Sequence, residues 1–320
     1  MLKSKDFIHR ELVNKFSDYY NQSLTIEIVF YRKKKIKGDN NAEIKAVINL
    51  GSEKKIVFGK LHSGYKNEFE IMKSLWNSHY KTSENFKIPE PILIIDSCNL
   101  LVMEYISGTP FKKQLYSKLL FPFVLFNNKF LVDSMNNCLN WLIDFESFIE
   151  IEKVTIDKYL NPALEKLNEI KIIKDSNREK YRNFLVKNKN NIKEVPEFLL
   201  NNDFRPQNIF LNNKSTIVFD WSMAEKYHVF TMVFSFLRPF FALQRYPFYS
   251  KKVMKNLIFD FINKYKDRTR FENFSLLFPY LGVIYEIDYL HRVINYRSES
   301  WSRNKSIEIS LKKIEEFLIY

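Results

Sequence analysis

The chain has 320 residues, of which 46% are hydrophobic and 16% are aromatic. This composition excludes a chain that is disordered as a whole, and the length suits two lobes. The formal net charge of +13 comes from 50 basic and 37 acidic residues. An excess of basic residues is typical of proteins that bind nucleic acid, an anionic surface or a phosphorylated ligand. Here the excess is spread along the chain, and no recognised nucleic-acid motif accompanies it. We therefore expect a solvated basic surface and no specific nucleic-acid partner.

Two further features concern the compartment. The cysteines, Cys98 and Cys138, are far apart and lack spaced partners, so we expect neither a disulfide framework nor a Cys-ligated zinc site. The first 16 residues, MLKSKDFIHRELVNKF, are charged throughout and lack the apolar core of a signal peptide. No uncharged apolar run is long enough to span a bilayer. We expect a cytoplasmic protein without a membrane span, and the oligomeric state stays open.

The first hundred residues have a β-rich pattern. Residues 5–21 predict a helix, LTIEIVFYR is rich in β-formers, and KKKIKGDNNAEIKAVINLGSEKKIVFGKL is interpreted as three strands. A loop at residues 38–41 and a turn near Gly51 separate these strands. YKNEFEIMKSLWNSHY has apolar residues at helical spacing, and KIPEPILIIDSCNLLVMEYISGTPF predicts two more strands, the second ending near Met103.

The pattern changes at residues 107–110, where a glycine and a proline interrupt it. The segments are then long and helical until about residue 200. Residues 196–221 return to short strands and turns, and helices are expected from about residue 229 onward. This order predicts a β-rich N-terminal lobe with one main helix over residues 1–106 and a mostly helical C-terminal lobe over residues 107–320.

Residues 201–221, NNDFRPQNIFLNNKSTIVFDW, concentrate polar groups beside short apolar runs. Asp203 lies on a polar loop, where a carboxylate can accept a hydroxyl proton. Asn208 and Asp220 offer the hard oxygen ligands that Mg²⁺ prefers, and Arg205 is a permanent cation that could face a phosphoryl group. Taken alone, the same residues are also typical of ordinary turns. The segment by itself leaves both interpretations open.

The segment resembles the catalytic loop of the aminoglycoside phosphotransferases and choline kinases, which reads H-G/N-D-x-x-x-x-N before a short hairpin and a strand ending I-D-W/F. Asp203, Asn208 and Asp220 match this pattern at the expected separation. IKGDNNAEIKAVINLGSEKKIVFGK is similar to the nucleotide-binding strands of that family, and NEFEIMKSL to the helix that follows them. IPEPIL and NLLVMEYISGTPF resemble the later strand and the hinge. The matches keep the family's order over about residues 25–235.

The resemblance implies an α+β, bilobal protein-kinase-like fold and an ATP-dependent phosphotransferase with ATP and Mg²⁺ as cofactors. The γ-phosphoryl group would move to a hydroxyl of a small molecule, such as a sugar, an amino alcohol like choline, or an antibiotic. The implied residues are Asp203 as base with Arg205 beside it, Asn208 and Asp220 as metal ligands, and, for the nucleotide, Lys60, its partner Glu68, Gly38, Asn40, Asn41, Met103, Glu104 and Ile106. Glu68 fits the family spacing better than Glu70.

Two positions depart from the family pattern. Asn201 stands where the family has a loop histidine, and Thr231 lies near the place of a buried aspartate that normally ties the catalytic loop down. A catalytically impaired pseudokinase that binds nucleotide or a partner is therefore one alternative, and a basic nucleic-acid-binding protein is another. A protein acceptor is not expected, because no recognisable activation segment follows Asp220.

One helical segment, YEIDYLHR, carries Glu286 and Asp288, which could line an acceptor pocket. We interpret them as a solvated helix face. The aromatic residues near 280–296 and Trp301 could surround a quaternary ammonium ion, but we interpret them as core. The five histidines have no metal-ligand spacing and are interpreted as surface or packing residues.

Overall fold

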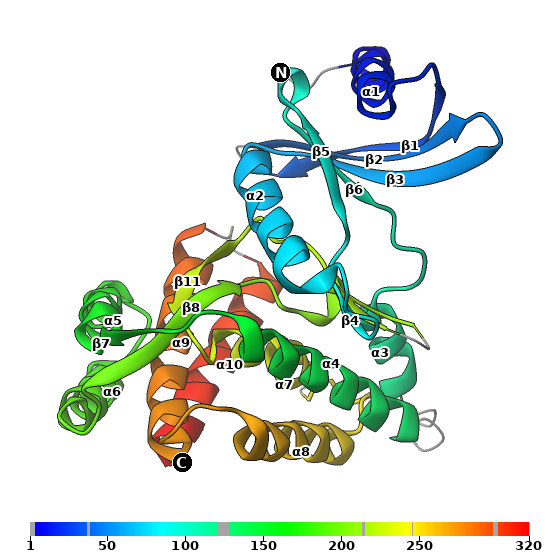
Figure 1. Cartoon of the computed structure of the whole chain (residues 1–320). Coiled ribbons are helices and arrows are strands. Elements are labelled where there is room, and N and C mark those ends of the chain that lie inside the picture. Colours follow the sequence, from blue (N-terminus) through cyan, green and yellow to red (C-terminus); the bar gives the residue numbers. More distant parts are fainter. Residues whose placement is uncertain are drawn as a thin grey trace. The chain divides into compact units, whose positions relative to one another are not determined.

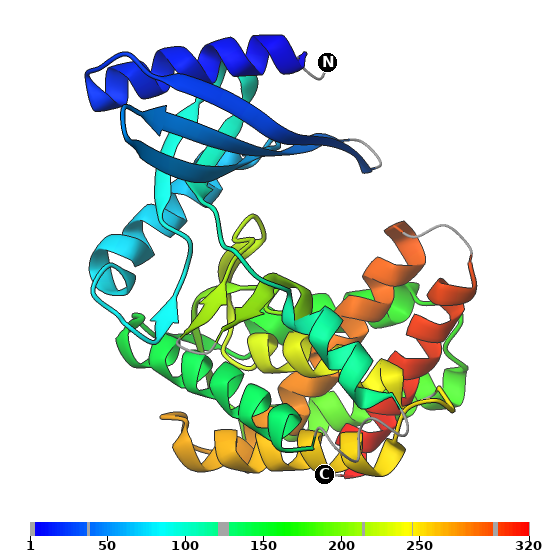
Figure 2. The same ribbon diagram turned by 90° about the vertical axis from the view of Figure 1, so that its right-hand side faces the viewer.

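The computed structural model describes residues 4–36, 39–120, 128–212, 215–244, 246–296 and 300–319 (Figures 1 and 2). The chain divides into two compact units. The first consists of Met1–Lys113 with Gln207–Ala224, and the second of Gln114–Pro206 with Glu225–Tyr320. The lobe boundary after residue 106 stays a prediction, and the return of residues 207–224 to the first unit was not anticipated.

The first unit is built on a five-stranded antiparallel sheet with the order β1-β2-β3-β6-β5 (Figure 1). Residues of β2 alternate between the two faces, and Ala42, Ile44, Ala46 and Ile48 are buried on one of them. The strands are β1 (Thr25–Ile36), β2 (Asp39–Leu50), β3 (Glu53–Leu61), β5 (Pro91–Ile95) and β6 (Leu100–Glu104).

Helix α1 (Lys5–Tyr20) covers that buried face. Ile8, Leu12 and Phe16 recur every four residues, so they form one stripe of the helix and join the core of the sheet. The Ser4 side chain accepts the Phe7 N–H at 3.2 Å and caps the first turn. The predicted helix over residues 5–21 is thus present.

The rest of the first unit includes a helix beside the large sheet and a second, smaller sheet. Helix α2 (Tyr65–Leu75) contacts β5 and β6 and runs into a short π-helical turn, η1 (Trp76–Tyr80). A small second sheet has the order β4-β10-β9, in which β4 pairs with β10 in parallel. Its elements are β4 (Phe86–Lys87), η4 (Pro206–Asn208), β9 (Ile209–Leu211) and β10 (Thr216–Val218), and η2 (Asp96–Cys98) links β5 to β6.

The second unit is mostly helical and contains one three-stranded sheet, β11-β8-β7 (Figure 2). Aromatic side chains dominate its core, with Phe230 in contact with Phe274 and Phe278. The elements are α3 (Phe111–Leu119), which begins at the unit boundary, α4 (Asn128–Phe148), β7 (Glu152–Thr155), α5 (Asp157–Glu169), α6 (Asp175–Lys189), β8 (Glu194–Asn201), β11 (Ala224–His228), α7 (Thr231–Leu243), α8 (Lys251–Arg268), α9 (Phe274–Tyr296) and α10 (Trp301–Ile319).

A buried ion pair connects three helices of the second unit. Arg238 on α7 donates to both carboxylate oxygens of Glu286 on α9, at 2.6 and 2.5 Å, and to the Ser310 hydroxyl on α10 at 2.7 Å. Glu286 is only 3% exposed, so its interpretation as part of a solvated helix face was wrong. A buried carboxylate needs a charged partner, and here that partner lies 48 residues earlier in the chain.

Two other predictions differ from the structure. Residues 39–41 belong to strand β2 and not to a loop, because the backbone of residues 39–41 pairs with residues 34–36 of β1. Strand β7 was not predicted, since its residues are mainly exposed and its β structure comes from pairing with β8. Within the described ranges, no helix is both long enough and apolar enough to cross a membrane.

Candidate functional site

Lys60 and Glu68 form an ion pair in the first unit. Side chains alternate along β3, so Lys60 projects from the face opposite to Val57 and Leu61, which join the core under α1. The Lys60 Nζ donates to Glu68 Oε1 at 3.1 Å and to Oε2 at 3.0 Å. Glu70 is exposed on the other side of α2, so helix phase selects Glu68 as the partner.

Glu68 is fully buried, accepts one further hydrogen bond and lies beside a histidine. The Trp221 N–H donates to Glu68 Oε1 at 2.9 Å, and the His62 Nε2 lies 2.8 Å from Oε2. A buried carboxylate is costly unless it is paired and hydrogen-bonded. Glu68 meets that condition and links β3, α2 and the segment that follows β10.

Asp220 completes this cluster. The Lys60 ammonium contacts Asp220 Oδ1, and the Ser222 hydroxyl donates to the same oxygen at 2.8 Å. Asp220 has a left-handed backbone with φ of +65°, a conformation that costs a non-glycine residue roughly 1–2 kcal/mol. Backbone strain of this kind persists where the surrounding contacts enforce it, and such positions cluster at functional sites.

Neighbouring charges stabilise the ionised forms of both Lys60 and Asp220. Burial opposes ionisation of Asp220, but the Lys60 ammonium outweighs burial and holds the pKa of Asp220 below its usual range. Burial likewise opposes the Lys60 charge, yet the carboxylates of Glu68 and Asp220 raise the pKa of Lys60. An ammonium and a carboxylate therefore face each other at neutral pH.

Asn208 lies at the end of η4, just before the hairpin of β9 and β10. It is 6% exposed, and its backbone carbonyl accepts the Phe219 N–H at 3.1 Å. The backbone of Asn208 thus pairs across the hairpin with Phe219, the residue before Asp220. The structure brings together Lys60, Glu68, Asp220 and Asn208, four of the residues implied by the family resemblance.

The Asp203 loop belongs to the second unit. Asn201 is fully buried, its side-chain Oδ1 accepts the Asp203 N–H at 2.9 Å, and its carbonyl accepts the Phe204 N–H at 3.1 Å. From α7, the Ser235 hydroxyl donates to the Asn202 carbonyl at 3.1 Å. The residue that replaces the family histidine therefore supports the loop through its own carboxamide.

Among the described residues, the Thr231 hydroxyl makes no hydrogen bond to this loop and lies 3.1 Å from the His228 Nδ1. Burial lowers the pKa of His228 to about 3, so the imidazole is neutral. The connection from α7 to the loop comes instead from Ser235, one helical turn after Thr231. Ser235 was not predicted to take part, although its place four residues after Thr231 on the same helix face was a usable signal.

An aromatic contact holds the Asp203 loop in the second unit, and an ion pair lies within the loop itself. The Phe204 ring is buried and stacks on Trp141 with ring centres 5.4 Å apart. The Arg205 guanidinium forms an ion pair with the Asp203 carboxylate. The predicted catalytic pair, Asp203 and Arg205, is therefore in direct contact on an anchored loop.

The remaining predicted nucleotide-binding residues lie at the ends of the large sheet. Met103 is buried in β6. The Glu104 N–H donates to the Glu90 carbonyl at 2.9 Å, and this backbone donor is therefore already hydrogen-bonded within the protein. Ile106 follows the strand. Asn40 and Asn41 lie on β2, and Gly38 falls outside the described residues.

No family model matches the sequence, and no curated protein matches it either. Solved structures do match over nearly the whole chain. A thermostable mutant of aminoglycoside phosphotransferase APH(4)-Ia, in a ternary complex with AMP-PNP and hygromycin B, has a TM-score of 0.59 at 10% identity, with 98% of this chain and 97% of that chain covered. The chain has the aminoglycoside phosphotransferase fold.

Two other solved structures have the same fold. ADP-bound aminoglycoside phosphotransferase APH(2'')-Ib has a TM-score of 0.54 at 15% identity and covers 97% of this chain and 99% of its own. An amicoumacin kinase in complex with AMP-PNP and Ca²⁺ has a TM-score of 0.51 at 13% identity, with 89% and 88% covered. At these identities the likeness concerns the phosphotransferase fold, and at that level the resemblance drawn from the sequence motifs is confirmed.

Proposed function

We propose that the protein is an ATP-dependent phosphotransferase that moves the γ-phosphoryl group to a hydroxyl of a small molecule. The contact of Lys60 with both Glu68 and Asp220 carries this proposal. Phosphoryl transfer depends on positioning and charge neutralisation, and a lysine held by a buried carboxylate is suited to phosphate oxygens. Solved structures of the same fold contain ADP or AMP-PNP, which supports ATP as the phosphoryl donor.

The donor set also suits Mg²⁺. Mg²⁺ is usually held by one or two carboxylates, with substrate phosphates and water as the other ligands. Asp220 supplies a carboxylate and Asn208 a carboxamide oxygen at the ends of one hairpin. When bound, Mg²⁺ would neutralise charge on the phosphates.

Asp203 would act on the acceptor. As the acceptor oxygen forms its bond to the γ-phosphorus, the bond between that phosphorus and the bridging oxygen of ADP breaks, and the hydroxyl proton passes to Asp203. Arg205, in contact with Asp203, would orient the carboxylate. The support of the loop by Asn201 and Ser235 favours an active enzyme over a pseudokinase, because it replaces the tie that a buried aspartate makes in the family pattern and that this chain lacks.

Nucleotide binding is tested by thermal unfolding with ATP, with and without Mg²⁺. A ligand at a hundred times its Kd stabilises the folded state by about 2.7 kcal/mol, so saturating nucleotide raises the melting temperature measurably. We expect a Mg²⁺-dependent increase that Asp220→Ala abolishes. Asp18→Ala, which changes an exposed aspartate of the same unit, should keep it. No increase at millimolar ATP would contradict the proposal.

Catalysis is tested separately with Asp203→Asn. This variant should keep the nucleotide-dependent stabilisation and lose phosphoryl transfer by about 100-fold or more, the range expected for a general base. Unchanged turnover in Asp203→Asn would exclude Asp203 as the base. Nucleotide binding without transfer to any hydroxyl acceptor would favour the pseudokinase alternative.

A further inference from the structure

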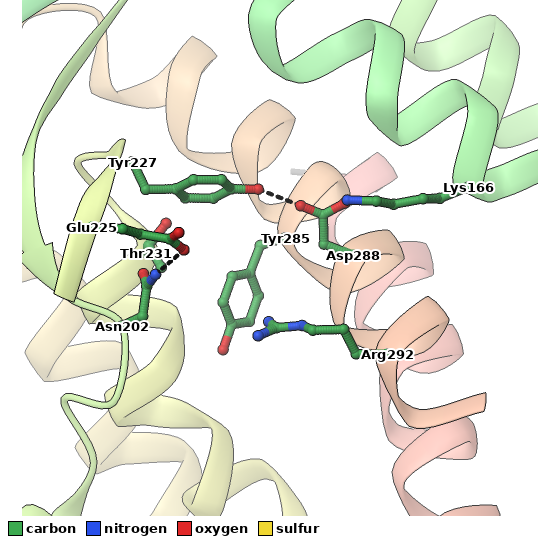
Figure 3. A pocket seen from close by; sticks show the side chains of 8 residues that line it. All are labelled: Lys166, Asn202, Glu225, Tyr227, Thr231, Tyr285, Asp288 and Arg292. Carbon is green, nitrogen blue, oxygen red and sulfur yellow. Dashed lines mark hydrogen bonds and ion pairs between the residues drawn. The ribbon is translucent and has the colours of Figure 1, made fainter. Parts of the chain in front are cut away.

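A cavity lies within the second unit, beside the Asp203 loop (Figure 3). Its volume is about 170 Å³. A cavity of about 150 Å³ holds one benzene molecule, so this one has room for roughly six to nine non-hydrogen atoms. The lining residues come from α5, the Asp203 loop, β11, α7 and α9: Lys166, Asn202, Glu225, Tyr227, Thr231, Tyr285, Asp288 and Arg292.

Two opposite charges face this cavity from different elements (Figure 3). Glu225 on β11 accepts a hydrogen bond from the Asn202 carboxamide, and no cation of the described residues forms an ion pair with it. Arg292 on α9 forms no ion pair with a carboxylate in the described part of the chain. The cavity therefore offers one carboxylate and one guanidinium for a ligand.

The other charges of the wall compensate each other. Asp288 accepts from the Lys166 ammonium at 2.9 Å and from the Tyr227 hydroxyl. Figure 3 shows this group above the space that separates Glu225 from Arg292. Asp288 and Lys166 thus add no net charge, and Glu225 and Arg292 determine which ligand charges are favoured.

Two polar atoms of the wall form no hydrogen bond within the described chain. Tyr285 is only 5% exposed, and within the described chain its hydroxyl forms no hydrogen bond; Figure 3 shows it close to the Arg292 guanidinium. The Oδ1 of Asn202 is buried and likewise has no hydrogen-bond partner among the described residues. The Tyr285 hydroxyl lines the cavity and can therefore pair with a polar ligand.

We infer that this cavity binds a small hydroxyl-bearing zwitterion of the amino-acid type. Its carboxylate would bind Arg292 and the Tyr285 hydroxyl, because a guanidinium pairs well with a planar carboxylate. Its ammonium group would bind Glu225. The inference that this zwitterion is the acceptor rests on the proposed function: Asn202 directly precedes Asp203, so the cavity wall begins one residue, about 3.8 Å along the Cα trace, from the candidate base.

Calorimetric titration without nucleotide tests the cavity directly. The probes are L-serine, L-threonine and L-homoserine, with ethanolamine, 4-hydroxybutyrate and kanamycin as comparisons. We expect an amino acid to bind at least about tenfold more tightly than ethanolamine, which lacks the carboxylate, or 4-hydroxybutyrate, which lacks the ammonium group. Kanamycin should bind no more tightly than ethanolamine, because it also lacks a carboxylate for Arg292.

Two variants test the roles of the two charges separately, and a third variant serves as a control. Arg292→Gln should weaken amino-acid binding about 10- to 100-fold and leave ethanolamine unaffected, whereas Glu225→Gln should weaken both. Both residues are exposed, so the variants should fold. Lys187→Gln removes one positive charge from an exposed site on α6 and should change nothing.

A second assay follows ADP release with ATP and Mg²⁺ for each bound probe. Release that depends on an amino acid and is lost in Arg292→Gln supports the inference. If no amino acid binds but ADP release responds to ethanolamine or kanamycin, the zwitterion inference is overturned and the proposed function stands. If amino acids bind through Arg292 and ATP does not bind, the cavity assignment is supported and the phosphotransferase proposal fails.

Discussion

The buried carboxylate of Glu68 offers the sharpest test of the first unit. Glu68→Gln keeps the shape of the side chain and one oxygen that can accept the Trp221 N–H. It removes the negative charge that faces Lys60 and His62. The amide nitrogen of the glutamine must also face one of these two groups in place of an acceptor oxygen.

The expected loss follows from these contacts. Removing one partner of a buried ion pair commonly costs about 3–5 kcal/mol, because the other charge stays behind. Lys60 keeps its contact with Asp220, so we expect a loss of about 2–3 kcal/mol in the free energy of unfolding. Because the pKa of Lys60 is raised in the folded state, this contribution is complete below pH 10 and is lost only as pH rises through the folded pKa.

Urea denaturation at pH 7.5 measures this loss. With a denaturant slope of about 1–3 kcal/mol per molar urea, a loss of 2–3 kcal/mol lowers the midpoint by about 0.7–3 M. The control is Glu70→Gln, an exposed position of the same helix, which should stay within about 0.5 kcal/mol of the unmodified protein. If Glu68→Gln behaves like this control, the buried pair does not stabilise the first unit and our reasoning is refuted.

Three other predictions concern the second unit. Burial raises the pKa of Glu146 to about 8, so the folded state holds a proton that the unfolded chain releases. The free energy of unfolding should therefore fall by up to about 1.4 kcal/mol per pH unit between about pH 4.5 and 8. Urea midpoints of Glu146→Gln across that range should not show this decline. Gly282→Ala should lower stability by about 1–3 kcal/mol in thermal melts, because its Cβ would lie 2.7 Å from the Phe317 ring, and an unchanged melting temperature would show that the ring moves freely. Asn201→Ala should cost about 1 kcal/mol and reduce kcat/KM at least tenfold, since it removes the carboxamide that holds the Asp203 N–H; an unchanged kcat/KM would exclude this positioning role.

Much of the fold could be predicted from the sequence alone. The alternation of apolar residues in residues 42–48 and the four-residue spacing of Ile8, Leu12 and Phe16 are local patterns with one dominant structural interpretation. The spacing of Asp203, Asn208 and Asp220 is also local, because catalytic loops carry their residues on one short segment. Residue type and separation were enough to indicate the fold, which the solved structures confirm.

Tertiary structure alone decided the features that depend on partners distant in the chain. Glu286 lies in a polar-looking segment, and only its contact with Arg238 shows that it is buried. The tie from Ser235 to the loop depends on how α7 packs, and the left-handed backbone of Asp220 depends on the contacts around it. The charges of Glu225 and Arg292 meet across one cavity because β11 and α9 fold against each other, a proximity that local sequence patterns do not encode.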